Sequence, residues 1–119
     1  MSELEISIRR AEGHEDISII TLSGSVDGYT MLKFEQAINK LLNSNRYKLI
    51  IDCKGLNFIS SAGVGVLIVA HCNLTPQNGD VKLINMNSEV YHTFELLGFS
   101  DVFHILKDEQ EALKAFAGV

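Results

Sequence analysis

Two adjacent serines, Ser60 and Ser61, are the residues of this sequence best placed to do chemistry. They follow an apolar run that ends at Asp52 and a short connecting segment, and they stand directly before an apolar segment long enough to be a helix. Serine is a favoured helix N-cap, so we expect one or both hydroxyls where that helix begins. This end of a helix carries unpaired N–H groups and the positive pole of the dipole, which tolerate an added phosphate. The pair is a candidate phosphorylation switch; a plain N-cap, contributing about 1 kcal/mol to helix stability, is the alternative that the residues alone leave open.

Enzymatic interpretations of the same region lack the residues they need. A serine-hydrolase elbow requires Gly-x-Ser-x-Gly, whereas the serines here lie in Ile59-Ser60-Ser61-Ala62-Gly63 without the leading glycine. A dinucleotide-binding loop built on Gly63 and Gly65 would need a third glycine where the chain has Ile68, and no Gly-Lys-Ser/Thr phosphate loop is present. The motifs therefore predict no catalytic residue, no metal ligand and no cofactor.

Other reactive residue types are scattered along the chain. Cys53 and Cys72 have neither CxxC spacing nor neighbouring metal-ligand residues, so we interpret them as small apolar fillers. Asp52 at a strand end could resemble the phosphoacceptor of a receiver domain, but the acidic residues that such a domain also needs fall here in a turn. The histidines have no carboxylate or cysteine at ligand spacing; they are His14, His71, His92 and His104.

Length and composition limit the class of protein. The chain has 119 residues with 46% apolar residues and a net charge of −5, enough for one compact domain over residues 1–119. We find no apolar run of about 18 residues and no signal peptide, so we expect a cytoplasmic protein with no membrane partner. Without a basic cluster, the acidic chain is not expected to bind nucleic acid.

The hydrophobic periodicity predicts strands alternating with helices after an initial hairpin. Residues 12–16 read as a turn longer than the tightest kind, and residues 23–28 as a loop. The expected fold is an α/β domain with a mixed, mostly parallel sheet of four to five strands, the first antiparallel, and about four helices. The predicted strands are 4–9, 17–22, 47–52, 81–86 and 102–106, and the predicted helices are 30–43, 62–74, 88–97 and one opening at Asp108.

Several segments, in this order and spacing, resemble the STAS-domain family, in particular the bacterial anti-sigma factor antagonists. The resemblance covers nearly the whole chain. It rests on the stretch Leu22-Ser23-Gly24-Ser25-Val26-Asp27 with Thr30, on Ile50-Ile51-Asp52, on residues 56–67 around the two serines, and on Phe94-Glu95-Leu96-Leu97-Gly98-Phe99.

This resemblance implies a switch operated by other proteins. In the family, a serine just before the second helix is phosphorylated by a partner of ATPase-like fold that is both serine kinase and anti-sigma factor. The matching residue is Ser61, with Ser60 as the alternative acceptor because it stands where the family usually has Asp. The unphosphorylated antagonist binds the anti-sigma factor and frees a sigma factor, and a serine phosphatase resets the switch. The chain would then be substrate and ligand, not an enzyme.

The same resemblance predicts a partner-binding surface around the serines and the second helix. Asp27 would offer its carboxylate to a basic residue of the partner. Gly63 and Gly65 would permit either close approach of the partner or tight packing of helix on sheet. Two alternatives are a STAS scaffold that is never phosphorylated and a small enzyme with a serine nucleophile. The predicted partner-binding residues are Asp27, Thr30, Phe58, Ser60, Ser61, Gly63 and Gly65.

Overall fold

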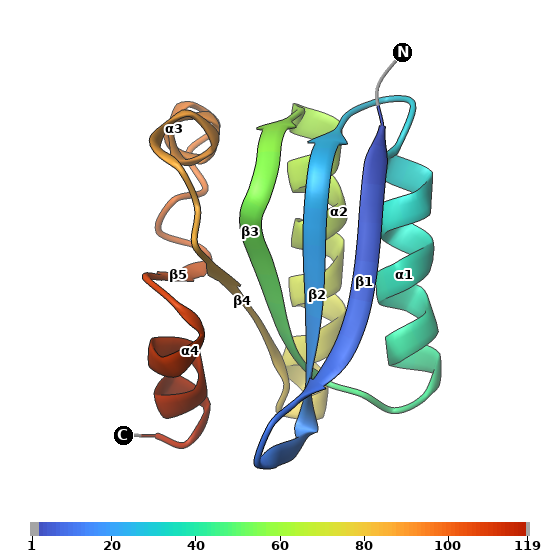
Figure 1. Cartoon of the computed structure of the whole chain (residues 1–119), viewed down its shortest axis with the longest axis vertical. Helices are drawn as coiled ribbons and strands as arrows, with labels where there is room; N and C mark the ends of the chain where they lie inside the picture. The colour runs from blue at the N-terminus through green and yellow to red at the C-terminus, as the bar shows by residue number, and fades with distance from the viewer. Residues whose placement is uncertain (1–2, 119) are drawn as a thin grey trace.

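A five-stranded sheet forms the centre of the computed structural model, which describes residues 3–118 (Figure 1). The strands lie side by side in chain order; β1 is antiparallel to β2, and every other neighbouring pair is parallel. This arrangement confirms the predicted mixed, mostly parallel sheet. The strands are β1 (Leu4–Ala11), β2 (His14–Val26), β3 (Lys48–Ile59), β4 (Asp80–Ile84) and β5 (His104–Leu106).

Three α-helices and one short 3-10 turn connect the strands and a fourth α-helix follows β5, as predicted in number and order. Helices α1 and α2 lie side by side against one face of the sheet, α4 packs on the opposite face, and α3 contacts β3 (Figure 1). No helix within residues 3–118 is long and apolar enough to span a membrane. The helices are α1 (Met31–Asn43), α2 (Ser61–Leu74), α3 (Ser88–Leu96) and α4 (Glu109–Phe116), and the 3-10 turn is Thr75–Gln77.

The apolar run in β3 is explained by two cores, one on each face of the sheet. Ile51 points into the larger core beneath α1 and α2, whereas its neighbour Ile50 points into the smaller core beneath α4. Because successive side chains of a strand point to opposite faces, only a strand covered on both sides reads as continuously apolar. The first half of β3 is therefore held from both faces of the sheet, at the end opposite to the two serines.

Two segments predicted as loops are strand instead. Residues 23–26 extend β2, since their backbone pairs with both neighbouring strands, Gly24 opposite Leu4 of β1 and Ser25 opposite Phe58 of β3. β3 correspondingly continues to its end at residue 59 rather than stopping at residue 52. The predicted long turn at residues 12–16 is also wrong: Ala11 pairs with His14, and Gly13 takes a left-handed φ of 78° in a two-residue turn. The other element ends agree with the prediction to within two residues.

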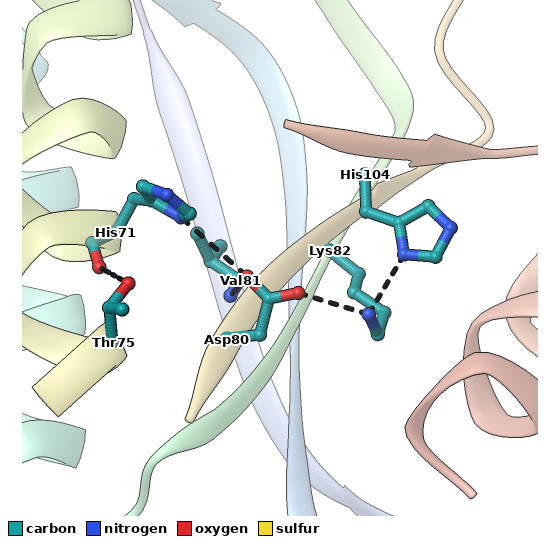
Figure 2. A network of polar contacts seen from close by, with 6 residues as sticks. All are labelled: His71, Thr75, Asp80, Val81, Lys82 and His104. Atoms are coloured by element: carbon teal, nitrogen blue, oxygen red, sulfur yellow. Dashed lines mark hydrogen bonds and ion pairs between the residues drawn. The ribbon is translucent and has the colours of Figure 1, made fainter. Parts of the chain in front are cut away.

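A charged side chain, Lys82 of β4, is buried where its neighbours are apolar, with only 6% of its surface exposed. Figure 2 shows its ammonium group between the Asp80 carboxylate, at 3.0 Å, and Nδ1 of His104 on β5, at 2.9 Å. The Phe116 ring lies 4.6 Å from the same nitrogen, and Nδ1 of His71 on α2 lies 3.6 Å from the other Asp80 oxygen. A buried charge needs such partners, so this cluster ties the short edge strand β5 to the sheet.

Candidate functional site at the start of helix α2

Ser60 and Ser61 occupy different places at the junction of β3 and α2. Ser60 is the N-cap: its backbone is extended, its hydroxyl oxygen accepts from the Gly63 N–H at 3.2 Å, and its carbonyl accepts from the Val64 N–H at 3.0 Å. Ser61 is the first helical residue and is exposed, and no hydrogen bond of its hydroxyl is present within residues 3–118. The N-cap role and the exposed hydroxyl therefore belong to two separate serines.

The loop between β2 and α1 is fixed to this junction. The Ser60 N–H donates to the Val26 carbonyl at 2.8 Å, which joins the two loops directly. One residue later, Oδ1 of Asp27 accepts from the Tyr29 N–H at 2.9 Å, an Asx-type turn that leads into α1. The half-buried carboxylate of Asp27 and the exposed hydroxyl of Ser61 thus lie on adjoining segments at one end of the sheet (Figure 1).

Thr30 holds this loop from inside. Only 7% of its surface is exposed, and its hydroxyl donates to the Ser25 carbonyl at 2.7 Å while accepting from the Asp27 N–H at 3.0 Å. Thr30 was predicted as a partner-binding residue, but its hydroxyl is engaged in these internal bonds. Its observed role is to position Asp27 and the first turn of α1.

Gly63 and Gly65 serve different purposes, although the resemblance predicts the same two possible roles for both. A Cβ atom at Gly63 would lie 2.6 Å from Cγ1 of Val26 and 2.8 Å from Cγ1 of Ile59, so this glycine lets α2 pack closely on the sheet. A Cβ atom at Gly65 would meet no atom within 4 Å. Gly65 is half-buried and leaves an open, side-chain-free patch on the outside of the helix.

Each of the three segments that meet at the serines carries a large exposed apolar side chain. Tyr29 in the β2–α1 loop is 84% exposed, Phe58 at the end of β3 is 51% exposed, and Val69 on α2 is 57% exposed. The sequence predicted that α2 would be extensively buried; its inner face is, but a stripe through Ala62, Gly65 and Val69 is not fully covered. We call Tyr29, Phe58, Ser61, Gly65 and Val69 the α2 face. Large exposed apolar side chains near one another are typical of protein-binding surfaces.

Tyr29 and Val69 were not among the predicted site residues. Val69 belongs to a helix so apolar that no sequence pattern separates its inner from its outer face. The exposure of Tyr29 could have been predicted, because an aromatic residue directly after Asp27-Gly28 lies in a polar turn, outside the predicted core elements.

The remaining reactive groups near β3 are engaged in structure. Oδ1 of Asp52 accepts from the Asn85 side chain at 3.0 Å and from the Lys54 N–H at 3.1 Å. Burial, reinforced by the negative charge of Asp52, raises the pKa of the Cys53 thiol to about 12. Cys53 is therefore a protonated core residue at neutral pH, whereas Cys72 on α2 is exposed.

Comparison with known proteins identifies the family. The family model described as STAS domain matches residues 9–112, which include both serines and the β2–α1 loop. The chain belongs to the STAS domain family. Among STAS relatives, the anti-sigma-B factor antagonist of Listeria monocytogenes is 28% identical over 108 residues, covering 91% of this chain and 95% of the relative.

Solved structures share the same STAS fold. An anti-sigma factor antagonist from Mycobacterium paratuberculosis superposes with a TM-score of 0.86 at 21% identity, covering 97% of this chain and 95% of that one. The Bacillus cell fate determinant SpoIIAA in its phosphorylated form gives a TM-score of 0.70 at 19% identity, covering 93% and 98%. At these identities the superpositions establish the fold, and the fold expected from the sequence resemblance is confirmed.

Proposed function

We propose that this STAS domain is an anti-sigma factor antagonist whose partner binding is switched by phosphorylation of Ser61. The unphosphorylated chain binds an anti-sigma factor through the α2 face and so frees a sigma factor for transcription. The named function of the Listeria relative and the existence of a phosphorylated form of SpoIIAA support this proposal. The observation that carries it is the exposed Ser61 hydroxyl in the first turn of α2.

The geometry favours Ser61 over Ser60 as the phosphate acceptor. Ser60 already uses its hydroxyl oxygen to cap the helix, and modifying that oxygen would disturb the bond from the Gly63 N–H. A phosphate on Ser61 would lie beside the same helix end without displacing a hydrogen bond. The helix dipole favours an anion there, so we expect the phosphorylated domain to remain folded.

The switch then acts through charge at an interface. Phosphorylation adds roughly −1.5 to −2 charges to Ser61, a residue of the α2 face. Covering such a group with a partner surface shaped for a neutral hydroxyl requires removing its water, which costs several kcal/mol. A loss of about 3–4 kcal/mol weakens binding several-hundred-fold.

The partner we propose is an anti-sigma factor of ATPase-like fold with serine kinase activity, and a serine phosphatase would reverse the modification. The kinase would supply the nucleotide, so this chain needs no cofactor. We also propose that the chain is not itself an enzyme. No histidine of the described chain hydrogen bonds to Ser60 or Ser61, so neither hydroxyl has the histidine base that commonly activates a serine nucleophile.

The decisive experiment combines phosphorylation with binding. The partner is captured from its native cell extract by the unmodified chain, purified, and incubated with ATP and each of wild type, Ser61→Ala and Ser60→Ala. Intact-mass measurement is expected to show a gain of one phosphate for wild type and Ser60→Ala but none for Ser61→Ala. Ser61→Ala should keep its affinity for the partner, whereas Ser61→Glu should weaken it with a nearly unchanged melting temperature.

Three results would contradict the proposal in different ways. Phosphate on Ser60 rather than Ser61 would show that the acceptor was misassigned. Binding without any phosphorylation would make the chain a constitutive STAS scaffold. Labelling of Ser60 or Ser61 by a fluorophosphonate probe would reveal an activated serine and hence an enzyme.

A further inference from the structure

A cavity of about 340 Å³ lies at the end of the α1 side of the sheet, remote from the serines. It forms where the β1–β2 hairpin passes the C-terminal end of α1, at the bottom of Figure 1, whereas α2 begins at the top. Arg9 also borders it but pairs with Glu109 of α4. None of the described residues that line the cavity is acidic. We call it the arginine pocket, and its lining is Ile8, Arg10, Ser18, Leu41, Ser44 and Arg46.

The fold fixes the position of Arg46 at both ends of its side chain. After α1, Asn45 adopts a left-handed φ of 59°, and the Arg46 N–H donates to the Leu41 carbonyl at 2.9 Å, the hydrogen bond of a Schellman motif. At the far end, Nε of Arg46 donates to the hydroxyl of buried Ser18 at 2.8 Å. The guanidinium is therefore held in place rather than moving freely in solvent.

This guanidinium has an unmet hydrogen-bonding requirement. Its Nη2 nitrogen is buried and has no acceptor among residues 3–118. The Ser18 hydroxyl, which accepts from Nε, likewise has no acceptor for its own O–H within that range. A buried N–H without an acceptor costs free energy, and it indicates a missing water or ion.

A second guanidinium faces the same space. Arg10 of β1 pairs with Ser18 of β2, so the two side chains are cross-strand neighbours on one face of the sheet. Neither Arg10 nor Arg46 forms an ion pair with any described residue, although the protein carries a net charge of −5. Two positive groups without a carboxylate partner make this corner of an acidic protein a local attractor for anions.

We propose that the arginine pocket binds a small anion bearing a phosphate group. Arginine presents several N–H donors in a planar fork that matches phosphate oxygens, and the Ser18 O–H adds a further donor. Ile8 and Leu41 form an apolar wall beside these donors, suited to a small substituent on the phosphate. The ligand is either free phosphate or a phosphomonoester, and the two are distinguished by titration.

The test is a backbone-amide NMR titration of the whole chain with inorganic phosphate and, separately, with phenyl phosphate, at constant ionic strength set by chloride. We expect saturable shifts of the Ser18, Ser44 and Arg46 amides, with a dissociation constant of about 1 mM or tighter. Similar affinities would identify free phosphate as the ligand; tighter binding of phenyl phosphate would identify a phosphomonoester whose substituent contacts the apolar wall.

Matched variants locate the charge that matters. Arg10→Gln should weaken binding at least about tenfold, because it removes one charged donor. Lys54→Gln removes the same charge from an exposed position on β3 outside the cavity lining, and should change binding less than about twofold. Equal effects of the two variants, shifts confined to Ser61 and Gly63 at the start of α2, or the absence of saturable shifts would each overturn the proposal.

Discussion

The close packing of α2 on the sheet can be tested by adding a single methyl group. In Gly63→Ala the new Cβ atom would lie 2.6 Å from Val26 Cγ1 and 2.8 Å from Ile59 Cγ1. Both neighbours are β-branched residues with restricted χ1 rotation and are fully buried, so they cannot swing aside without disturbing the core. Overpacking of this kind costs about 1–3 kcal/mol.

Gly65→Ala is the matched control, since a Cβ atom there meets nothing within 4 Å. Both substitutions replace a helical glycine in the first turns of α2, so both gain helix propensity of up to about 1 kcal/mol. The difference between the variants therefore isolates the steric cost. We expect Gly63→Ala to unfold with about 1–3 kcal/mol less stability than Gly65→Ala.

Urea denaturation followed by circular dichroism measures this difference directly. In thermal unfolding, 1 kcal/mol corresponds to about 4 °C for a chain of this size, so the melting temperatures of the two variants should differ by roughly 4–12 °C. Equal stabilities of Gly63→Ala and Gly65→Ala would refute the reasoning. In that case α2 would be free to move outward by the width of a methyl group, and Gly63 would not fix its distance from the sheet.

Three further predictions concern other residues. Asp27→Asn keeps the acceptor oxygen of the turn but removes the charge, so affinity for the proposed anti-sigma factor should fall about tenfold; unchanged affinity would remove Asp27 from the interface. With the pKa of Cys53 at about 12, a thiol reagent at pH 8 should modify Cys72 rapidly and Cys53 only after unfolding. Rapid modification of both thiols in the folded protein would contradict the burial of Cys53. Lys82→Met removes the ammonium donor to the Asp80 carboxylate, so it should lower the free energy of unfolding in urea by about 1–3 kcal/mol. The exposed control Lys54→Met should stay within about 0.5 kcal/mol, and equal losses would argue against the Lys82 cluster.

Local patterns were sufficient to predict most of the fold. The alternation of Leu4, Ile6 and Ile8 marked a half-exposed strand, and the unbroken run from Leu49 to Ile51 marked a buried one. The serine pair marked the start of α2 to within one residue. Each of these signals depends on side chains only a few positions apart, so the sequence contains them without reference to the rest of the molecule.

The features that could not be predicted depend on contacts between distant segments. Residues 23–26 contain two serines and a glycine, poor strand formers, and they are held in β2 by hydrogen bonds to strands on both sides. The partners of Lys82 include His104, 22 positions later, so its burial has no local pattern. The separate roles of Gly63 and Gly65 likewise appear only when α2 rests on Val26 and Ile59.

The length of β2 has a consequence for how many molecules this small domain can hold at once. The strand carries Ser18 near its beginning and ends at Val26, whose carbonyl accepts from the Ser60 N–H. At 3.3 Å per residue, Ser18 and Val26 are separated by about 26 Å. A small anion seated near Ser18 would therefore not occupy the surface around Ser61. Occupation of one end therefore leaves the other end sterically open, and the domain can bear both occupants simultaneously.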